Sequence, residues 1–278
     1  MKRIVVFLLG ILPLALCAQN NTIGDFTRDE SVFYAQTKQV NQFFRRFNGE
    51  EDATGKRYYS KDAQFRDPKA RKKYLNILFD KSNGGISSSD KNSFINQVVT
   101  KPGASFLDFH GKSWYAEVSC NFSYKKEKVN LILFLQIEKQ DSGYKWVFSN
   151  VFFDKFNSFF SHLNDTSNTT YFLHPLSHEL DFMNLNKVFR DPNDVDYYVE
   201  RNYEPDQMSI FIMEVKSGNL KFESVNDVKF HFFQVPGWYF EVSYFNRNDY
   251  NSGWLISNLL KVSDKDKNIL IRHYTHAK

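Results

Sequence analysis

Two carboxylate–phenol pairs are the side chains of this sequence best placed to do chemistry. Tyr115 and Glu117 lie two positions apart, and Tyr239 and Glu241 repeat that spacing later in the chain. Residues two apart in a β-strand point to the same face. Each pair would therefore set a carboxylate beside a phenol, which is a usable polar anchor for a ligand. These four residues are the predicted ligand-binding residues. If the opposite face of each strand is the buried one, the glutamates are instead exposed or at a domain contact.

A second pair suggests acid/base chemistry. Asp108 and His110 are also two apart, and a strand expected over 105–110 would place them on one face, where they could share a proton. An enzyme of this kind would use Asp108, His110 or Glu117 as its base. The simpler interpretation is a polar pair facing solvent, and on it no catalytic residue is assigned.

Metal, cofactor and nucleic-acid sites are not predicted. His174 and His178 have the four-residue spacing of helical metal ligands, but no third ligand accompanies them. The glycine-containing segment 49–56 has the wrong spacing for a phosphate loop and lacks the hydroxyl residue that would hold magnesium. Basic residues are scattered along the chain, whereas nucleic-acid binding requires a concentrated basic face.

The first phenol–carboxylate pair belongs to a strand that occurs twice. The segment 114–119 reads WYAEVS, and the segment 238–243 reads WYFEVS. Strict alternation of apolar and polar residues indicates a half-buried strand. The face that carries Trp114 and Trp238 is the more apolar, so we expect it to face the core. The repetition suggests that one unit was duplicated.

The same order of elements surrounds both copies, with helices first and strands after them. An α+β fold of two tandem domains is therefore predicted, with one domain over 19–165 and the other over 170–278. In the first half, helices are expected over 28–48, after Pro68 and around 94–99, and strands over 105–110, 113–123, 128–138 and 144–153. In the second half, helices are expected after Pro175 and Asp206, and strands over 220–224, 227–234, 237–246, 253–262 and 268–274.

The N-terminus and the composition indicate an exported globular protein. Residues 1–18 have the charged start, short apolar core and small residues of a signal peptide. We expect a periplasmic or extracellular location and no transmembrane span, with lipidation of Cys17 as the alternative. Hydrophobic residues make up 42% of the chain and charged residues 24%, which is typical of a folded chain. Cys120 is then the single cysteine left, and we expect it to be a buried, inert thiol.

Helices followed by a curved antiparallel meander, written twice, resemble the nuclear transport factor 2-like superfamily of cystatin-like α+β domains. Behind a signal peptide, the pair is similar to exported bacterial proteins of this type. The resemblance implies sheets wrapped around helices, with a cone-shaped pocket in each. Its members include ketosteroid-isomerase-like and polyketide-cyclase-like enzymes as well as binding and dimerisation modules.

The sequence thus favours an exported non-enzymatic binding module. Cone-shaped pockets or sheet faces would bind a small apolar ligand or a protein of the cell envelope. An acid/base enzyme of the ketosteroid-isomerase or polyketide-cyclase type is the alternative. A third possibility is a scaffold whose domains or copies pair through their sheet faces.

Overall fold

The structure of the chain is a computed structural model. It describes residues 40–52, 54–100, 102–141, 143–160, 171, 183–200, 203, 206–248 and 251–275. The predicted signal peptide, Cys17, His174, His178 and the helix expected after Pro175 up to residue 182 lie outside these residues. Within them, no helix is long and apolar enough to cross a membrane.

Three helices precede the sheet, as the sequence predicts. The first covers residues 40–48 within the described part of the chain. Helix α2 (Pro68–Ile77) begins where Asp67 accepts a hydrogen bond from the backbone N–H of Ala70, with Pro68 in the first turn. Helix α3 (Ser88–Val99) begins where Ser87 accepts from the N–H of Asp90. In both helices a side chain satisfies a backbone donor that the helix leaves free.

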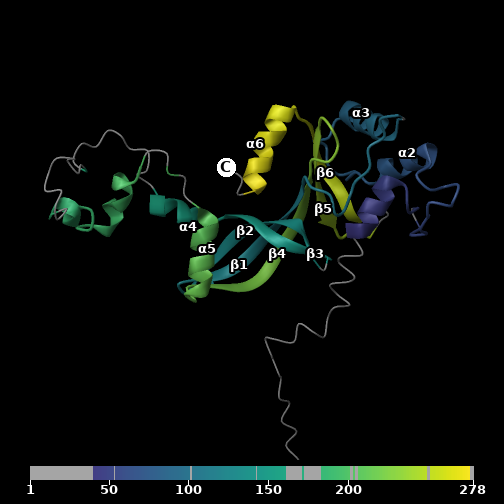
Figure 1. Cartoon of the computed structure of the whole chain (residues 1–278). Helices are drawn as coiled ribbons and strands as arrows, with labels where there is room; N and C mark the ends of the chain where they lie inside the picture. The colour runs from purple at the N-terminus through teal and green to yellow at the C-terminus, as the bar shows by residue number, and fades with distance from the viewer. Residues whose placement is uncertain are drawn as a thin grey trace, which may run out of the picture. The chain divides into compact units, whose positions relative to one another are not determined.

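Six strands form one antiparallel sheet. They are β1 (Trp114–Tyr124), β2 (Glu127–Gln140), β3 (Gly143–Phe152), β4 (Leu220–Phe232), β5 (Trp238–Phe245) and β6 (Gly253–Lys261), in the spatial order β3-β2-β1-β4-β5-β6 (Figure 1). Strands β1 and β2 are joined at Lys125 and Lys126, which both have positive φ, as the tightest hairpin turns require. The predicted α+β class with antiparallel strands is confirmed.

The prediction of two separate sheets, one in 19–165 and one in 170–278, is wrong. Strand β1 pairs along its whole length with β4, which pairs in turn with β5, so both copies of the repeated strand belong to one sheet. A three-stranded meander would leave one edge of β1 with unpaired backbone groups, and β4 satisfies them. The copies also occupy unequal places, because β1 is central and β5 is next to the edge strand β6. The predicted pair of cones is therefore absent from this sheet.

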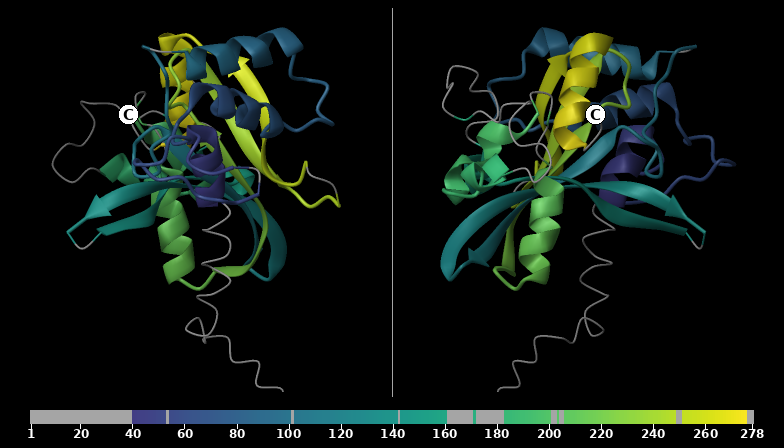
Figure 2. Two further views of the ribbon diagram at one scale, coloured as in Figure 1. Left: turned by 90° about the vertical axis from the view of Figure 1, so that its right-hand side faces the viewer. Right: turned by 60° about the vertical axis from the view of Figure 1, so that its left-hand side comes forward.

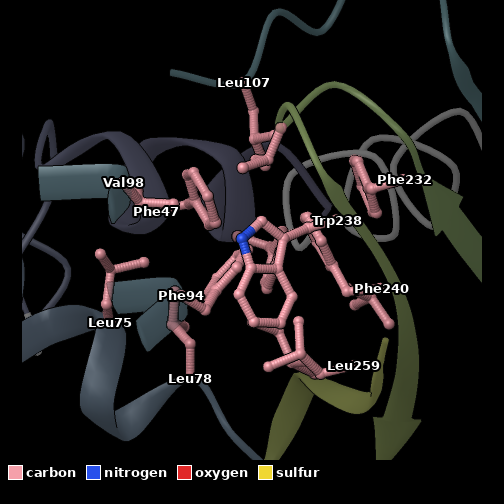
Figure 3. Close-up of a cluster of buried hydrophobic side chains, with 14 of the residues drawn as sticks. Phe47, Leu75, Leu78, Phe94, Val98, Leu107, Phe232, Trp238, Phe240 and Leu259 are labelled. Atoms are coloured by element: carbon pink, nitrogen blue, oxygen red, sulfur yellow. The ribbon is translucent and has the colours of Figure 1, made fainter. Parts of the chain in front are cut away.

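One face of the sheet packs against the three N-terminal helices. Trp114 and Trp238 are buried on this face, as predicted, together with Phe232 and Phe240. The rings pack closely: Phe232 stacks on Trp114 at 5.5 Å and on Phe240 at 4.8 Å between centroids. Figure 3 shows residues of the helices and strands meeting in this core. Burying such aromatic side chains is the main source of stability here.

The last helix covers the opposite face. Helix α6 (Asp264–Tyr274) and the helices α2 and α3 lie on different sides of β5 and β6 (Figure 1). The strand predicted over 268–274 is therefore wrong. Ser263 accepts from the N–H of Asp266, and Leu270, Ile271 and Tyr274 form a helical stripe that packs on the sheet.

Helix α5 (Gln207–Lys216) covers the far end of the sheet, with Asp206 as its N-cap, as predicted. Phe211 of this helix packs on Phe122 of β1 in a second apolar cluster, which also buries Cys120. Figure 2 shows α5 crossing the strands away from α6. The short helices are α4 (Asp154–Asn157), η1 (Ser158–Phe160), η2 (Met183–Lys187) and η3 (Pro192–Tyr198).

Candidate functional site

The four predicted ligand-binding residues lie on one face of the sheet, beneath α6. Tyr115 stacks on Tyr274 of α6 with 5.5 Å between ring centroids. The other three residues surround or flank His231, a buried residue of β4 that the sequence analysis did not single out. Tyr115 and Glu241 lie in the same cross-strand row as His231. These residues therefore lie in one region of one sheet, and the expectation that they line two separate pockets is wrong.

His231 joins a carboxylate to two phenols. Its Nε2 lies 2.9 Å from Oε2 of Glu117, and its Nδ1 lies 2.9 Å from the hydroxyl of Tyr239 and 3.3 Å from that of Tyr274. Glu117 can only accept, so in a neutral imidazole Nε2 donates to Glu117 and Nδ1 accepts from a phenol. Burial raises the pKa of Tyr274 to about 12 and raises the pKa of Tyr239 further, which keeps both hydroxyls protonated.

Glu117 is the end of this chain of hydrogen bonds that reaches solvent. Its side chain is 24% exposed, against 3% for His231. The hydrogen bond from His231 holds the pKa of Glu117 below its ordinary value, against the opposing effect of burial. A charged carboxylate linked through a histidine to a tyrosine could pass a proton, which is the chemistry of the acid/base alternative.

Glu241 is engaged separately from Glu117. Its Oε1 accepts from Ser257 at 2.8 Å and from Ser243 at 3.1 Å, and Nζ of Lys229 lies 3.8 Å away. The two glutamates of the repeated strand thus have different partners. Glu241 is held by two hydroxyl groups of its own β5–β6 hairpin and lies near the ammonium group of Lys229 on β4, which favours a positioning role within the sheet.

The loop before β1 does not supply the predicted acid/base pair. Residues 105–110 form no strand, so the prediction there is wrong, and Asp108 and His110 are both exposed. Oδ1 of Asp108 accepts from the backbone N–H of His110, a local turn bond, while the His110 ring stacks on Tyr144. The polar, turn-forming side chain of Asp108 overrides the alternation that suggested a strand. The structure does not bring these two residues to Glu117.

A pocket of about 560 Å³ lies on the other face of the sheet, beside the N-terminal helices. Such a volume is within the usual range for small-molecule sites. Trp254 and Tyr244 contribute from β6 and β5, and Phe43 contributes from the helix 40–48. The remaining lining comes from the first helix, the loop after it, α2 and its C-cap, and the start of β6: Gln42, Arg46, Asp52, Thr54, Lys73, Tyr74, Ile77, Leu78, Ser252, Gly253 and Leu255.

Two residues of the lining have an N–H donor without an acceptor. Nε of Arg46 and Nε1 of Trp254 are buried and make no hydrogen bond. Buried donors of folded proteins are nearly always paired, so two unpaired donors among the lining residues are unusual. This site is not predicted from the sequence, because Arg46 and Trp254 are far apart along the chain and no spacing pattern links them.

Comparison of the chain with family models, with curated proteins and with solved structures found no match in any of the three. The function therefore has to be argued from the geometry of the chain itself. Across the ranges that the structure describes, no group of three or more histidine, cysteine and carboxylate side chains could hold a metal ion.

The Glu117–His231 contact should make stability depend on pH. Because the folded-state pKa of Glu117 is lowered, its stabilising effect is present above the unfolded-state pKa, near 4.5, and is lost as the pH falls through the folded value. We expect Glu117→Gln to lower the free energy of unfolding by about 1–2 kcal/mol at pH 7. Urea unfolding at pH 7 and at about pH 3.5 measures both values.

The difference between the wild type and Glu117→Gln should shrink at the lower pH. The matched control is Glu138→Gln, which changes an exposed carboxylate on β2. A loss that is equal at both pH values would contradict the charged contact with His231.

Proposed function

We propose that this chain is an exported binding module that holds a small apolar ligand in the pocket beside the helix 40–48. The single observation that carries the proposal is an open cavity of about 560 Å³ with an aromatic wall. A pocket of this volume is large enough for a small molecule, and rings on one wall offer apolar contact. The predicted signal peptide, residues 1–18, supports export.

The aromatic wall explains why the ligand would be apolar. Trp254 packs on Tyr244 with 5.4 Å between ring centroids and on Phe230 at 4.8 Å. Ile77, the last residue of α2, and Leu78, its C-cap, line the same pocket. An apolar molecule in this pocket would leave water and contact rings and aliphatic side chains on two sides. Each Å² of its apolar surface that is buried would contribute about 25 cal/mol of favourable free energy.

Filling the pocket should abolish binding of an apolar probe. We expect N-phenyl-1-naphthylamine, a neutral dye that fluoresces in apolar sites, to bind the wild type and to bind Ile77→Trp at least about tenfold more weakly, because the larger ring occupies its space. A fluorescence titration measures both affinities. Ile269→Trp, on the exposed side of α6, is the matched control and should bind as the wild type does.

Equal affinity of the wild type and Ile77→Trp would overturn the assignment of this pocket. The export part of the proposal has a separate test, which is the mass of the secreted chain. We expect a start at Gln19, whereas a lipid-modified Cys17 would support the lipoprotein alternative.

The second candidate function is an acid/base enzyme, and the Glu117–His231–Tyr239 chain is the observation that favours it. Glu117 would be its base, and Asp108 and His110 would play no part. It ranks second because Tyr274 and the rest of α6 pack over His231 and leave Glu117 as the accessible end. The resemblance to the nuclear transport factor 2-like superfamily stays a prediction, as does a partner at a sheet face.

A further inference from the structure

The pocket carries more positive than negative charge. Arg46 and Lys73 line it, and Lys73 makes no ion pair with any residue that the structure describes. The acidic residue of the lining, Asp52, accepts hydrogen bonds from neutral groups only, so it keeps its negative charge and the two cations of the lining exceed it by one charge. Its Oδ1 accepts from Thr54 and from the N–H of Lys56, and its Oδ2 accepts from Tyr58.

Glu51 does not neutralise Arg46 fully. This buried carboxylate is held by Nε of Arg45 at 2.7 Å and by Nε2 of Gln42 at 2.5 Å. Nε of Arg46 lies 3.5 Å from Glu51, too far and too poorly aligned for a hydrogen bond. The two arginines share one carboxylate, so one positive charge remains beside the pocket.

The polar and apolar parts of the pocket are distinct. Arg46 and Lys73 come from the first helix and α2, whereas Trp254 and Tyr244 come from the β5–β6 hairpin. A guanidinium and an ammonium group both bind carboxylates through charge-assisted hydrogen bonds.

We propose that the ligand of this pocket is a small amphiphile, with an apolar chain on the Trp254 side and an anionic end group, such as a carboxylate, bound by Arg46 and Lys73. This inference rests on the proposed function and names the class of ligand. A purely apolar ligand would take water away from the Lys73 ammonium and from the incompletely neutralised Arg46 without offering either a new partner, which is unfavourable. A cationic amphiphile would be repelled.

Three ten-carbon probes test the proposal: decanoate, decanol and decylamine, below their micelle-forming concentrations, measured by isothermal titration calorimetry at pH 7. We expect decanoate to bind roughly tenfold more tightly than decanol, and decylamine to bind most weakly. Lys73→Gln and Arg46→Gln should each lower the affinity for decanoate about threefold to tenfold and leave that for decanol unchanged. Lys221→Gln, which changes an exposed side chain on β4, should change neither affinity.

The outcomes separate the two proposals. Equal affinities of the wild type for decanoate and decanol would overturn the anionic end group and leave the apolar site standing. Binding of none of the three probes would count against the proposed function itself. Arg46→Gln also removes a positive charge next to the buried Glu51 and could therefore prevent folding. In that event the comparison of decanoate affinities between the wild type and Lys73→Gln, which changes an exposed side chain, is the test.

Discussion

Replacing Phe232 with alanine is expected to lower the free energy of unfolding by about 3–5 kcal/mol. Phe232 is fully buried in β4, between the two copies of the repeated strand. Its ring stacks on Trp114 of β1 and on Phe240 of β5, with interplanar angles of 8° for both pairs. The rings on both sides are held by the sheet, so the cavity cannot collapse easily.

Urea unfolding followed by circular dichroism measures this loss. Phe222→Ala is the control, because Phe222 lies on the same strand with 57% of its surface exposed, and we expect it to cost less than about 1 kcal/mol. The unfolding of Phe232→Ala should stay a single transition that is shifted as a whole. Two transitions, of which only one shifts, would indicate two independent domains and contradict the single sheet.

Replacing Arg71 with methionine is expected to lower the free energy of unfolding by a similar amount, about 3–5 kcal/mol. Arg71 is buried in α2, and its guanidinium donates to three backbone carbonyls: Phe47 at 2.8 Å, Val98 at 3.0 Å and Ser105. These carbonyls belong to the first helix, to α3 and to the loop before β1. Burial lowers the pKa of Arg71 to about 10, so it stays charged at neutral pH.

Methionine would keep the apolar stem of Arg71 and remove every donor. The carbonyls of Phe47 and Ser105 would then lose the donor that Arg71 supplies, and the carbonyl of Val98 would keep only the N–H of Ser105, which is costly. Lys72→Met, at an exposed neighbour on the same helix, is the matched control and should change stability by less than about 0.5 kcal/mol. Similar losses in both variants, measured by urea unfolding, would show that Arg71 does not tie the helices together.

The sequence predicted most strands but not their pairing. Alternation around Trp114 and Trp238 identified β1, β5 and the buried face of each. It could not show that β1 pairs with β4, because alternation reports the faces of a strand and says nothing of its two edges. The apparent repeat then favoured two sheets, although the sheet uses the two copies differently.

The strand predicted over 268–274 is wrong for a different reason. Leu270, Ile271 and Tyr274 satisfy either a short strand or a helical stripe, and the cap at Ser263 decides for the helix. Helix α6 brings Tyr274 to His231. Because a strand was predicted in its place, the contact between these two residues could not be predicted. Tyr115, Glu117, Tyr239 and Glu241 were correctly placed on one face of their strands, but His231 was missed because a single histidine in a strand carries no pattern.

The pocket is the central claim, and the indole N–H signals of the four tryptophans test it most directly. Nε1 of Trp238 donates to Gln97 and that of Trp114 donates to the carbonyl of Phe109, whereas Nε1 of Trp254 has no acceptor. In a ¹H–¹⁵N spectrum assigned with Trp254→Phe, adding decanoate should shift the Trp254 signal and leave that of Trp238 in place. Binding of decanoate that leaves the Trp254 signal unmoved would contradict the account.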